Sequence, residues 1–213
     1  ILCAGIDLSV GSMLALSGVI CAALITGGMD AGSACLLTLL AGAAMGLLNG
    51  LIVTRGRAAP FIATLATMTI YRGLTLAYTE GRPISGMDSD LFDLFGNGYV
   101  FRLIPIPVVL MFVVFGIAWF ILNRTAFGRH TYAVGGNEEA SRISGGRGAR
   151  VKAMVFTLSG VLSALAGIVL TSRLDSAQPT AGSGYELDAI AAVVLGGTSL
   201  SGGRGWIIGT LIG

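Results

Sequence analysis

Five stretches of about 20 mostly apolar residues divide this chain, and they constrain its fold more than any other feature. They lie at roughly 8–27, 33–53, 60–79, 104–123 and 153–172. A helix needs about 20 such residues to cross a bilayer, where its backbone groups find no water to bond. A further apolar run starts at Trp206. We therefore predict an all-α polytopic membrane protein with at least five transmembrane helices.

The composition agrees with a membrane protein. Charged residues make up 11% of the 213 residues, against about 25% in soluble domains. The net charge of +2 is small and gives no information about nucleic acid. From the composition we expect the lipid bilayer as the partner of this chain, and we expect no nucleic acid. The sequence opens and closes inside apolar runs. We expect residues 1–213 to form a single transmembrane domain that is incomplete at both ends.

The basic residues predict the orientation, because cytoplasmic loops of membrane proteins carry an excess of Lys and Arg. The connection 124–152 is rich in arginine, and the turn 54–59 holds two more arginines. The connection 80–103 mixes acids with arginines. With five spans in series, 54–59 and 124–152 lie on one side and 80–103 on the other. We expect a cytoplasmic loop at 124–152 and a periplasmic loop at 80–103.

Glycines spaced four residues apart mark a helix-packing face on the second span. Gly42, Gly46 and Gly50 fall on one side of a helix and allow a neighbouring backbone to approach closely. The fifth span has a similar face at Gly160, Ala164 and Gly167. The contact is expected either within one subunit or between two copies of the chain.

The region after the fifth span has the pattern of a broken helix. Ser183 and Glu186 have the spacing of a capping box, and Gly196-Gly197 indicate a helix end. The apolar stretch between them is too short to cross a bilayer. Transporters place such half-helices beside their translocation path. The alternative is a helix that lies flat at the outer interface.

The start of the chain shares a short sequence motif with this region. Gly5-x-x-Leu8-Ser9-x-Gly11 matches Gly197-x-x-Leu200-Ser201-x-Gly203, which indicates an internal repeat of two helix breaks. Asp7 stands in the first copy where Ser199 stands in the second. A carboxylate suits the positive end of a helix, so we interpret Asp7 as a cap of the first span. The residues assigned to the hinges or to a path are Gly5, Asp7, Ser9, Gly11, Asn49, Gly196, Gly197, Ser199 and Ser201.

The connection 124–152 is longer than a simple link between two spans requires. Asn137 can cap a short helix in which Glu138 and Glu139 occupy the positive end of the dipole. Ala140 and Arg142 follow in that helix, and Gly145 ends it. This length and pattern predict a docking site for a partner, with a solvated loop facing lipid headgroups as the alternative.

No catalytic or metal-binding constellation is present. The single histidine and the cysteines Cys3, Cys21 and Cys35 show no ligand spacing. The glycine-rich segment 201–205 lacks the lysine of a phosphate-binding loop. The chain is therefore not expected to be an enzyme or to bind a cofactor. Arg72 is the only charge within a span, and we expect it to bond a carbonyl or an acid such as Glu80; the alternative is that it marks the end of that span.

Four stretches resemble the permease subunit of bacterial ABC importers for monosaccharides, the ribose permeases above all. They are residues 5–11, 61–84, 132–145 and 176–205. The resemblance implies a homodimer in the inner membrane, a cytoplasmic ATPase docked on 137–145, and a periplasmic sugar-binding protein on the outer face. ATP and Mg²⁺ would bind to the ATPase and not to this chain.

A permease for a neutral sugar needs small polar groups along its path. Ser9, Ser12, Asn49, Thr64, Thr67 and Thr69 are candidates, although such side chains often bond their own helix. An ion-coupled carrier is the first alternative, and the absence of acids from the spans weighs against it. A passive channel is the second, and it would need no docking loop.

Overall fold

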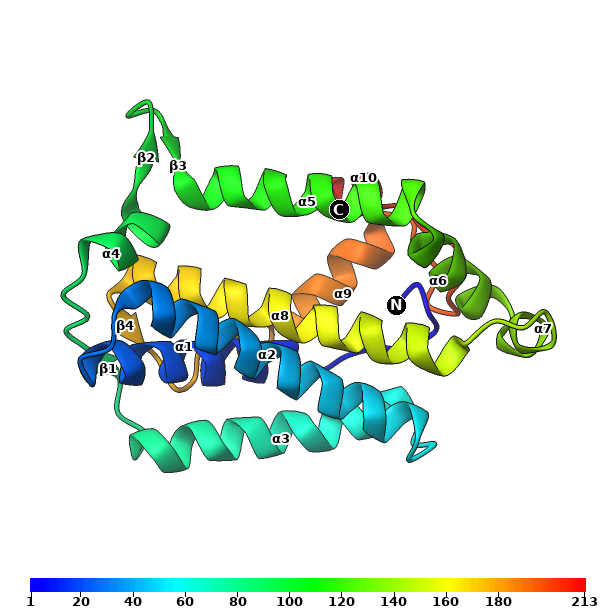
Figure 1. The fold of residues 1–213 in the computed structure, drawn as a ribbon, viewed down its shortest axis with the longest axis horizontal. Helices are drawn as coiled ribbons and strands as arrows, with labels where there is room; N and C mark the ends of the chain where they lie inside the picture. The colour runs from blue at the N-terminus through cyan, green and yellow to red at the C-terminus, as the bar shows by residue number, and fades with distance from the viewer.

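The computed structural model describes residues 1–213 as ten helices and four two-residue strands (Figure 1). The long helices are α1 (Val10–Thr26), α2 (Ala31–Thr54), α3 (Pro60–Thr79), α5 (Ile106–Arg124) and α8 (Gly148–Leu174). The short ones are α4 (Asp90–Asn97), α6 (Ala126–Gly136), α7 (Glu138–Ile143), α9 (Tyr185–Leu195) and α10 (Ile207–Ile212). The strands are β1 (Ile84–Ser85), β2 (Tyr99–Val100), β3 (Ile104–Pro105) and β4 (Ser176–Ala177). The predicted all-α fold is confirmed.

The five predicted spans correspond to the five long helices. Three of them, α2, α5 and α8, are both long and apolar enough to cross a membrane. The apolar helix α1 is shorter, at 17 residues. Helix α3 has 20 residues but carries Arg72 and five threonines, which lower its mean hydropathy. The helix α8 begins five residues earlier than predicted, because Gly148–Lys152 continues the helix beyond the apolar stretch.

The connections between the long helices gather at two ends of the bundle (Figure 1). At one end lie the turn between α2 and α3 and the helices α6 and α7. At the other end lie α4 and the strands. The Arg-rich connections thus share one end of the bundle, and their orientation toward the cytoplasm stays a prediction from the basic residues.

The centre of the bundle is the contact between α2 and α8, and it is built from glycines. A Cβ atom placed on Gly46 would lie 2.2 Å from the carbonyl oxygen of Phe156, and one on Gly42 would lie 2.4 Å from the Cβ of Ala164. In return, a Cβ on Gly160 would lie 2.2 Å from the carbonyl oxygen of Gly42. The glycine face of α2 therefore packs against α8 of the same chain, where only glycine allows this approach.

The end of the bundle opposite the Arg-rich connections is covered by residues of the connection 80–103. Met87 and the α4 residue Phe92 are buried in one cluster with Val19, Ile168 and Ala177. The Ser172 hydroxyl donates to the Phe92 carbonyl, and β1 pairs antiparallel with β4. These contacts fix the point at which the chain leaves α8 and enters the segment before α9.

Candidate functional site

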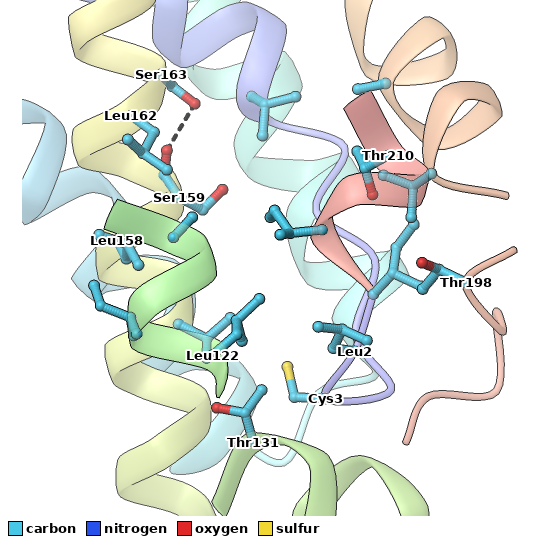
Figure 2. A pocket seen from close by; sticks show the side chains of 18 of the residues that line it. Leu2, Cys3, Leu122, Thr131, Leu158, Ser159, Leu162, Ser163, Thr198 and Thr210 are labelled. Carbon is cyan, nitrogen blue, oxygen red and sulfur yellow. Dashed lines mark hydrogen bonds between the residues drawn. The ribbon is translucent and has the colours of Figure 1, made fainter. Parts of the chain in front are cut away.

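A cavity of about 870 Å³ separates α5 from α1 and α8. Residues of α6, α9 and α10 line its remaining sides, and 18 of its 25 lining residues are hydrophobic. Figure 2 shows Ser159 and Ser163 of α8 on one wall and Thr198 and Thr210 on the opposite wall. The cavity therefore presents a few neutral hydroxyl groups on an apolar surface.

Of the residues assigned from sequence to hinges or a path, only Gly11 lines this cavity. The polar lining residues that sequence reasoning missed are Thr131, Ser159, Ser163, Asp188, Thr198 and Thr210. The four-residue spacing of Ser159 and Ser163 in an apolar helix was a usable signal, because it places both on one helix face. The other residues come from short helices and, for Thr198, from the irregular stretch between α9 and α10, and the span pattern does not show where these lie in space.

Asp7 closes a turn ahead of α1. Its Oδ1 accepts hydrogen bonds from the Ser9 backbone N–H at 3.0 Å and from the Ser9 hydroxyl at 2.6 Å. Its Oδ2 accepts a hydrogen bond from the Ser159 hydroxyl at 2.9 Å. The N-cap of α1 is Ser9, which makes no side-chain cap bond. The prediction that Asp7 caps the first span is therefore wrong: the carboxylate is engaged in an Asx turn and in a contact with α8.

Ser159 lies near the middle of α8, so the contact with Asp7 places an acid at membrane depth. The predicted spans contained no acid, because the first was drawn from residue 8. Irregular backbone persists at this depth only where protein covers it or water fills a cavity. Here three donor groups satisfy the Asp7 carboxylate. The arrangement is that of an anchor for the irregular segment.

A buried polar network continues from this turn into α2 and α3. The Asn49 amide donates to the Ser9 hydroxyl at 2.8 Å, and the Tyr71 hydroxyl donates to the Met45 carbonyl at 3.1 Å. Thr64 accepts a hydrogen bond from the Leu8 backbone N–H at 3.1 Å. Ser9 and Asn49 are fully buried. They hold the segment before α1 in place and do not face the cavity.

The remaining hydroxyl groups proposed from sequence bond to nearby backbone. Ser12 donates to the Ser9 carbonyl, Thr67 to the Thr64 carbonyl and Thr69 to the Ala66 carbonyl. None of the three lines the cavity. Their hydrogen-bonding capacity is directed to their own helix, as is common for Ser and Thr in apolar helices.

The second copy of the repeated motif, residues 197–203, contains the same kind of turn as the first. The Ser199 hydroxyl accepts a hydrogen bond from the Ser201 backbone N–H at 3.2 Å, as Asp7 does from Ser9. The two copies differ in where the next helix begins. Helix α1 starts inside the first copy, whereas α10 starts at Ile207, beyond the second. The shared element is thus a turn closed by a side chain two residues earlier, and a charge is not required for it.

The short helix α9 is followed by an irregular stretch, as predicted, and its C-cap is Gly196. The chain then folds back toward the end of α9, where the Trp206 indole N–H donates to the Gly196 carbonyl at 3.1 Å. The predicted capping box is wrong. The N-cap is Gly184, with a φ of 89°, and Ser183 donates instead to the Thr180 carbonyl. A left-handed residue between Ser183 and the helix prevents that serine from acting as the cap.

Glu186 still contributes to the start of α9. Its Oε1 accepts a hydrogen bond from the Gly184 backbone N–H at 3.3 Å. A Cβ on Gly11 would lie 2.6 Å from Glu186 Oε2 and 2.1 Å from the Gly182 carbonyl oxygen. Gly11 therefore lets the loop before α9 pack directly on the first turn of α1.

Arg72 anchors that same loop from α3. Its guanidinium donates to the Pro179 carbonyl at 2.7 Å and to the Ala181 carbonyl at 2.8 Å. The prediction of a carbonyl partner is confirmed, and no contact joins Arg72 to Glu80, which ends α3 in a left-handed conformation. One charged side chain thus holds two carbonyls of an irregular segment that would otherwise lack partners.

We expect Arg72→Met to loosen the segment 178–184. Hydrogen bonds from a charged donor contribute about 1.5–3 kcal/mol each, so the variant should unfold at a lower temperature and be cleaved faster within this segment. Thermal unfolding in detergent and limited proteolysis measure both effects. Arg72→Lys keeps the charge and is the matched control, with a smaller expected loss. A methionine variant with wild-type stability and protection would contradict the anchoring role.

The connection 124–152 contains the predicted short helix. The Asn137 side chain accepts a hydrogen bond from the Ala140 backbone N–H at 2.9 Å, which caps α7. Glu138 and Glu139 occupy its first turn. Glu138 pairs with Lys152 of α8 and Glu139 with Arg142, each at 2.6 Å. Gly145 follows the helix with a φ of 81°. No residue of α7 is buried, so one face of this helix is free at the end of the bundle.

Comparison with known proteins identifies relatives over the whole chain. The family described as the branched-chain amino acid transport system / permease component matches residues 1–213. A ribose import permease protein of Bacillus subtilis is 60% identical over 100% of the chain and 66% of its own length. One of Haemophilus influenzae is 55% identical over 100% of the chain and 67% of its own length. A D-allose transport system permease of Escherichia coli is 42% identical over 100% of the chain and 65% of its own length.

The chain therefore spans about two thirds of the length of the curated relatives it matches. No solved structure was found to match it.

Proposed function

The chain belongs to the permease family described for branched-chain amino acid transport systems, and on this premise we propose that it is the membrane permease of an ATP-driven importer of a monosaccharide. It is a multi-pass protein of the bacterial inner membrane. The observation that carries the proposal is 60% identity to a ribose import permease over the whole chain. Ribose is accordingly the first candidate for the solute.

The cavity supports a neutral, hydroxyl-bearing solute. Its volume of about 870 Å³ lies within the range of about 300–1,000 Å³ for small-molecule sites. Asp188 is the only charged residue among its lining. Hydroxyl groups such as those of Ser159 and Thr210 can bond sugar hydroxyls without a countercharge. Allose, xylose and galactose-type hexoses are also neutral and rich in hydroxyl groups, and one relative carries D-allose in its name.

The partners follow from the same proposal. A cytoplasmic ATPase would dock on α7 and would bind ATP and Mg²⁺, so that hydrolysis takes place outside this chain. The exposed face of α7 and its ion pair with α8 support such a docking site. A periplasmic sugar-binding protein would deliver the solute to the opposite end, and a second copy of the permease would complete the conduit.

The test is uptake by the full-length protein, reconstituted in proteoliposomes with its ATPase and its binding protein. We expect ribose uptake that requires ATP inside and the binding protein outside, with lower rates for xylose, allose and galactose. Uptake that persists without ATP and collapses with an ion gradient would support the ion-coupled carrier. Equilibration of ribose without either energy source would support a channel.

A further inference from the structure

Two irregular segments meet at the C-terminal end of α6: residues 2–4, just ahead of the first copy of the repeated motif, and residues 202–203 of the second copy. The chain ahead of α1 and the stretch between α9 and α10 run side by side next to this helix (Figure 1). The Gly203 backbone N–H donates to the Leu2 carbonyl at 2.9 Å, which joins the two segments to each other. Neither segment has regular structure of its own, so its position depends on such contacts.

Gly135 of α6 sits directly against this junction. A Cβ on Gly135 would lie 1.8 Å from the Leu2 carbonyl oxygen and 2.7 Å from the Gly203 nitrogen. A Cβ on Gly203 would in turn lie 2.5 Å from the Gly136 Cα. Three backbones therefore touch without intervening side chains. Such a contact cannot absorb a displacement by a change of rotamer.

A hydrogen bond reinforces the contact one turn earlier in α6. The Tyr132 hydroxyl donates to the Gly205 carbonyl at 2.8 Å. The hydroxyl of a tyrosine is protonated at neutral pH in any case, and burial raises the pKa of Tyr132 further. Thr131, the neighbouring residue, is buried and lines the cavity. The same helix thus contacts the stretch between α9 and α10 and forms part of the cavity wall.

The other end of the connection is α7. Only Asn137 separates α6 from α7, and it belongs to both, since it is the C-cap of one and the N-cap of the other. The helix α7 is tied to α8 by the Glu138–Lys152 pair. A movement of α7 would therefore change the position of α6, with no flexible linker between them.

We propose that α6 is a rigid relay that passes movement of α7 at once to the chain ahead of α1 and to the stretch between α9 and α10, and that Gly135 and Tyr132 are the positioning residues of this relay. The inference rests on the proposed function, in which an ATPase moves α7. It accounts for a feature that transport alone does not require: the direct backbone contact of Gly135, at the end of α6, with both the chain ahead of α1 and the stretch between α9 and α10.

Adjacent glycines allow a matched test in the full-length transporter with its ATPase and binding protein. A Cβ on Gly136 meets nothing within 4 Å, whereas one on Gly135 meets backbone. We expect Gly135→Ala to assemble with the ATPase and hydrolyse ATP, but to transport about fivefold less sugar per ATP or lower still. Gly136→Ala should keep the wild-type ratio. The ratio reports coupling, which a general loss of stability would not change selectively.

Tyr132→Phe provides a variant that keeps the volume of the side chain and removes only the hydrogen bond to Gly205. We expect it to lower the same ratio by about twofold or more with normal assembly. Wild-type ratios in both Gly135→Ala and Tyr132→Phe would overturn the relay. A wild-type assembly that transports none of the sugars with ATP would instead overturn the proposed function, so the two failures are distinguishable.

Discussion

Replacement of Gly46 by leucine is expected to prevent α2 and α8 from packing and to abolish the yield of folded protein. The Cβ alone would lie 2.2 Å from the Phe156 carbonyl oxygen and 3.0 Å from the Gly160 nitrogen. Both atoms belong to the backbone of α8 and cannot rotate away. Overpacking of a core costs about 1–3 kcal/mol where side chains can adjust, and here the helices themselves must separate.

Separation of α2 from α8 would affect the whole bundle, since helices in lipid associate through close packing and not through the hydrophobic effect. The measurement is the yield of monodisperse protein in mild detergent, with the unfolding temperature of whatever remains. Gly116→Leu on α5 is the matched control, because a Cβ there meets nothing within 4 Å.

The same experiment decides between the two interpretations of the glycine face. If the face joined two copies of the chain, Gly46→Leu would give a folded monomer with a normal unfolding temperature. If it packs within the chain, as the structure has it, the variant loses the fold. A folded monomer would therefore contradict the packing described above.

The sequence was sufficient to predict the spans, because each consists of an apolar run of helical length. It was also sufficient to predict the cap of α7, since the bond from Asn137 is local. The start of α9 was not predictable from Ser183 and Glu186 alone. Gly184 takes a left-handed conformation there, and Gly182 before it packs on Gly11, a residue far away in the chain, so local spacing does not determine where the helix begins.

Asp7 illustrates the limit of reasoning from one helix at a time. The helix dipole predicts that its carboxylate lies at the N-terminal end of α1, and a local hydrogen bond from the Ser9 backbone N–H does exist. The second oxygen is committed to Ser159 of α8, a contact between residues 152 positions apart. No periodicity in either segment indicates which helix faces the turn. The role of Gly135 could not be predicted from the sequence for the same reason, because its neighbours in space are Leu2 and Gly203.

Reversal of both acids of α7, Glu138→Lys with Glu139→Lys, is expected to abolish ATP-driven uptake. Lysines in the first turn would oppose the positive end of the helix dipole, a cost of about 0.3–1 kcal/mol for each position. The pairs with Lys152 and Arg142 would become repulsive. Because α7 has no buried residue to hold it otherwise, we expect the helix to unfold or swing away from α8.

The two ion pairs differ in solvent exposure, and this difference provides a control for the experiment. The Lys152 side chain is 14% exposed, whereas Arg142 and Glu139 are 74% and 65% exposed. Exposed pairs contribute about 0–1 kcal/mol, so Glu139→Lys alone should have a small effect. Glu138→Lys should account for most of the loss, and Lys152→Glu in that background should restore part of it by re-forming the pair with its charges exchanged.

The readouts are co-purification of the full-length permease with its ATPase and uptake in proteoliposomes. Loss of both in the double variant, with recovery of both on the charge exchange, is the result expected if α7 is the docking helix and Lys152 sets its position. Unchanged association and uptake in the double variant would contradict the docking assignment. Retained association with lost uptake would place the defect after docking, in the connection from α7 to α6, and would then predict the same phenotype for Gly135→Ala.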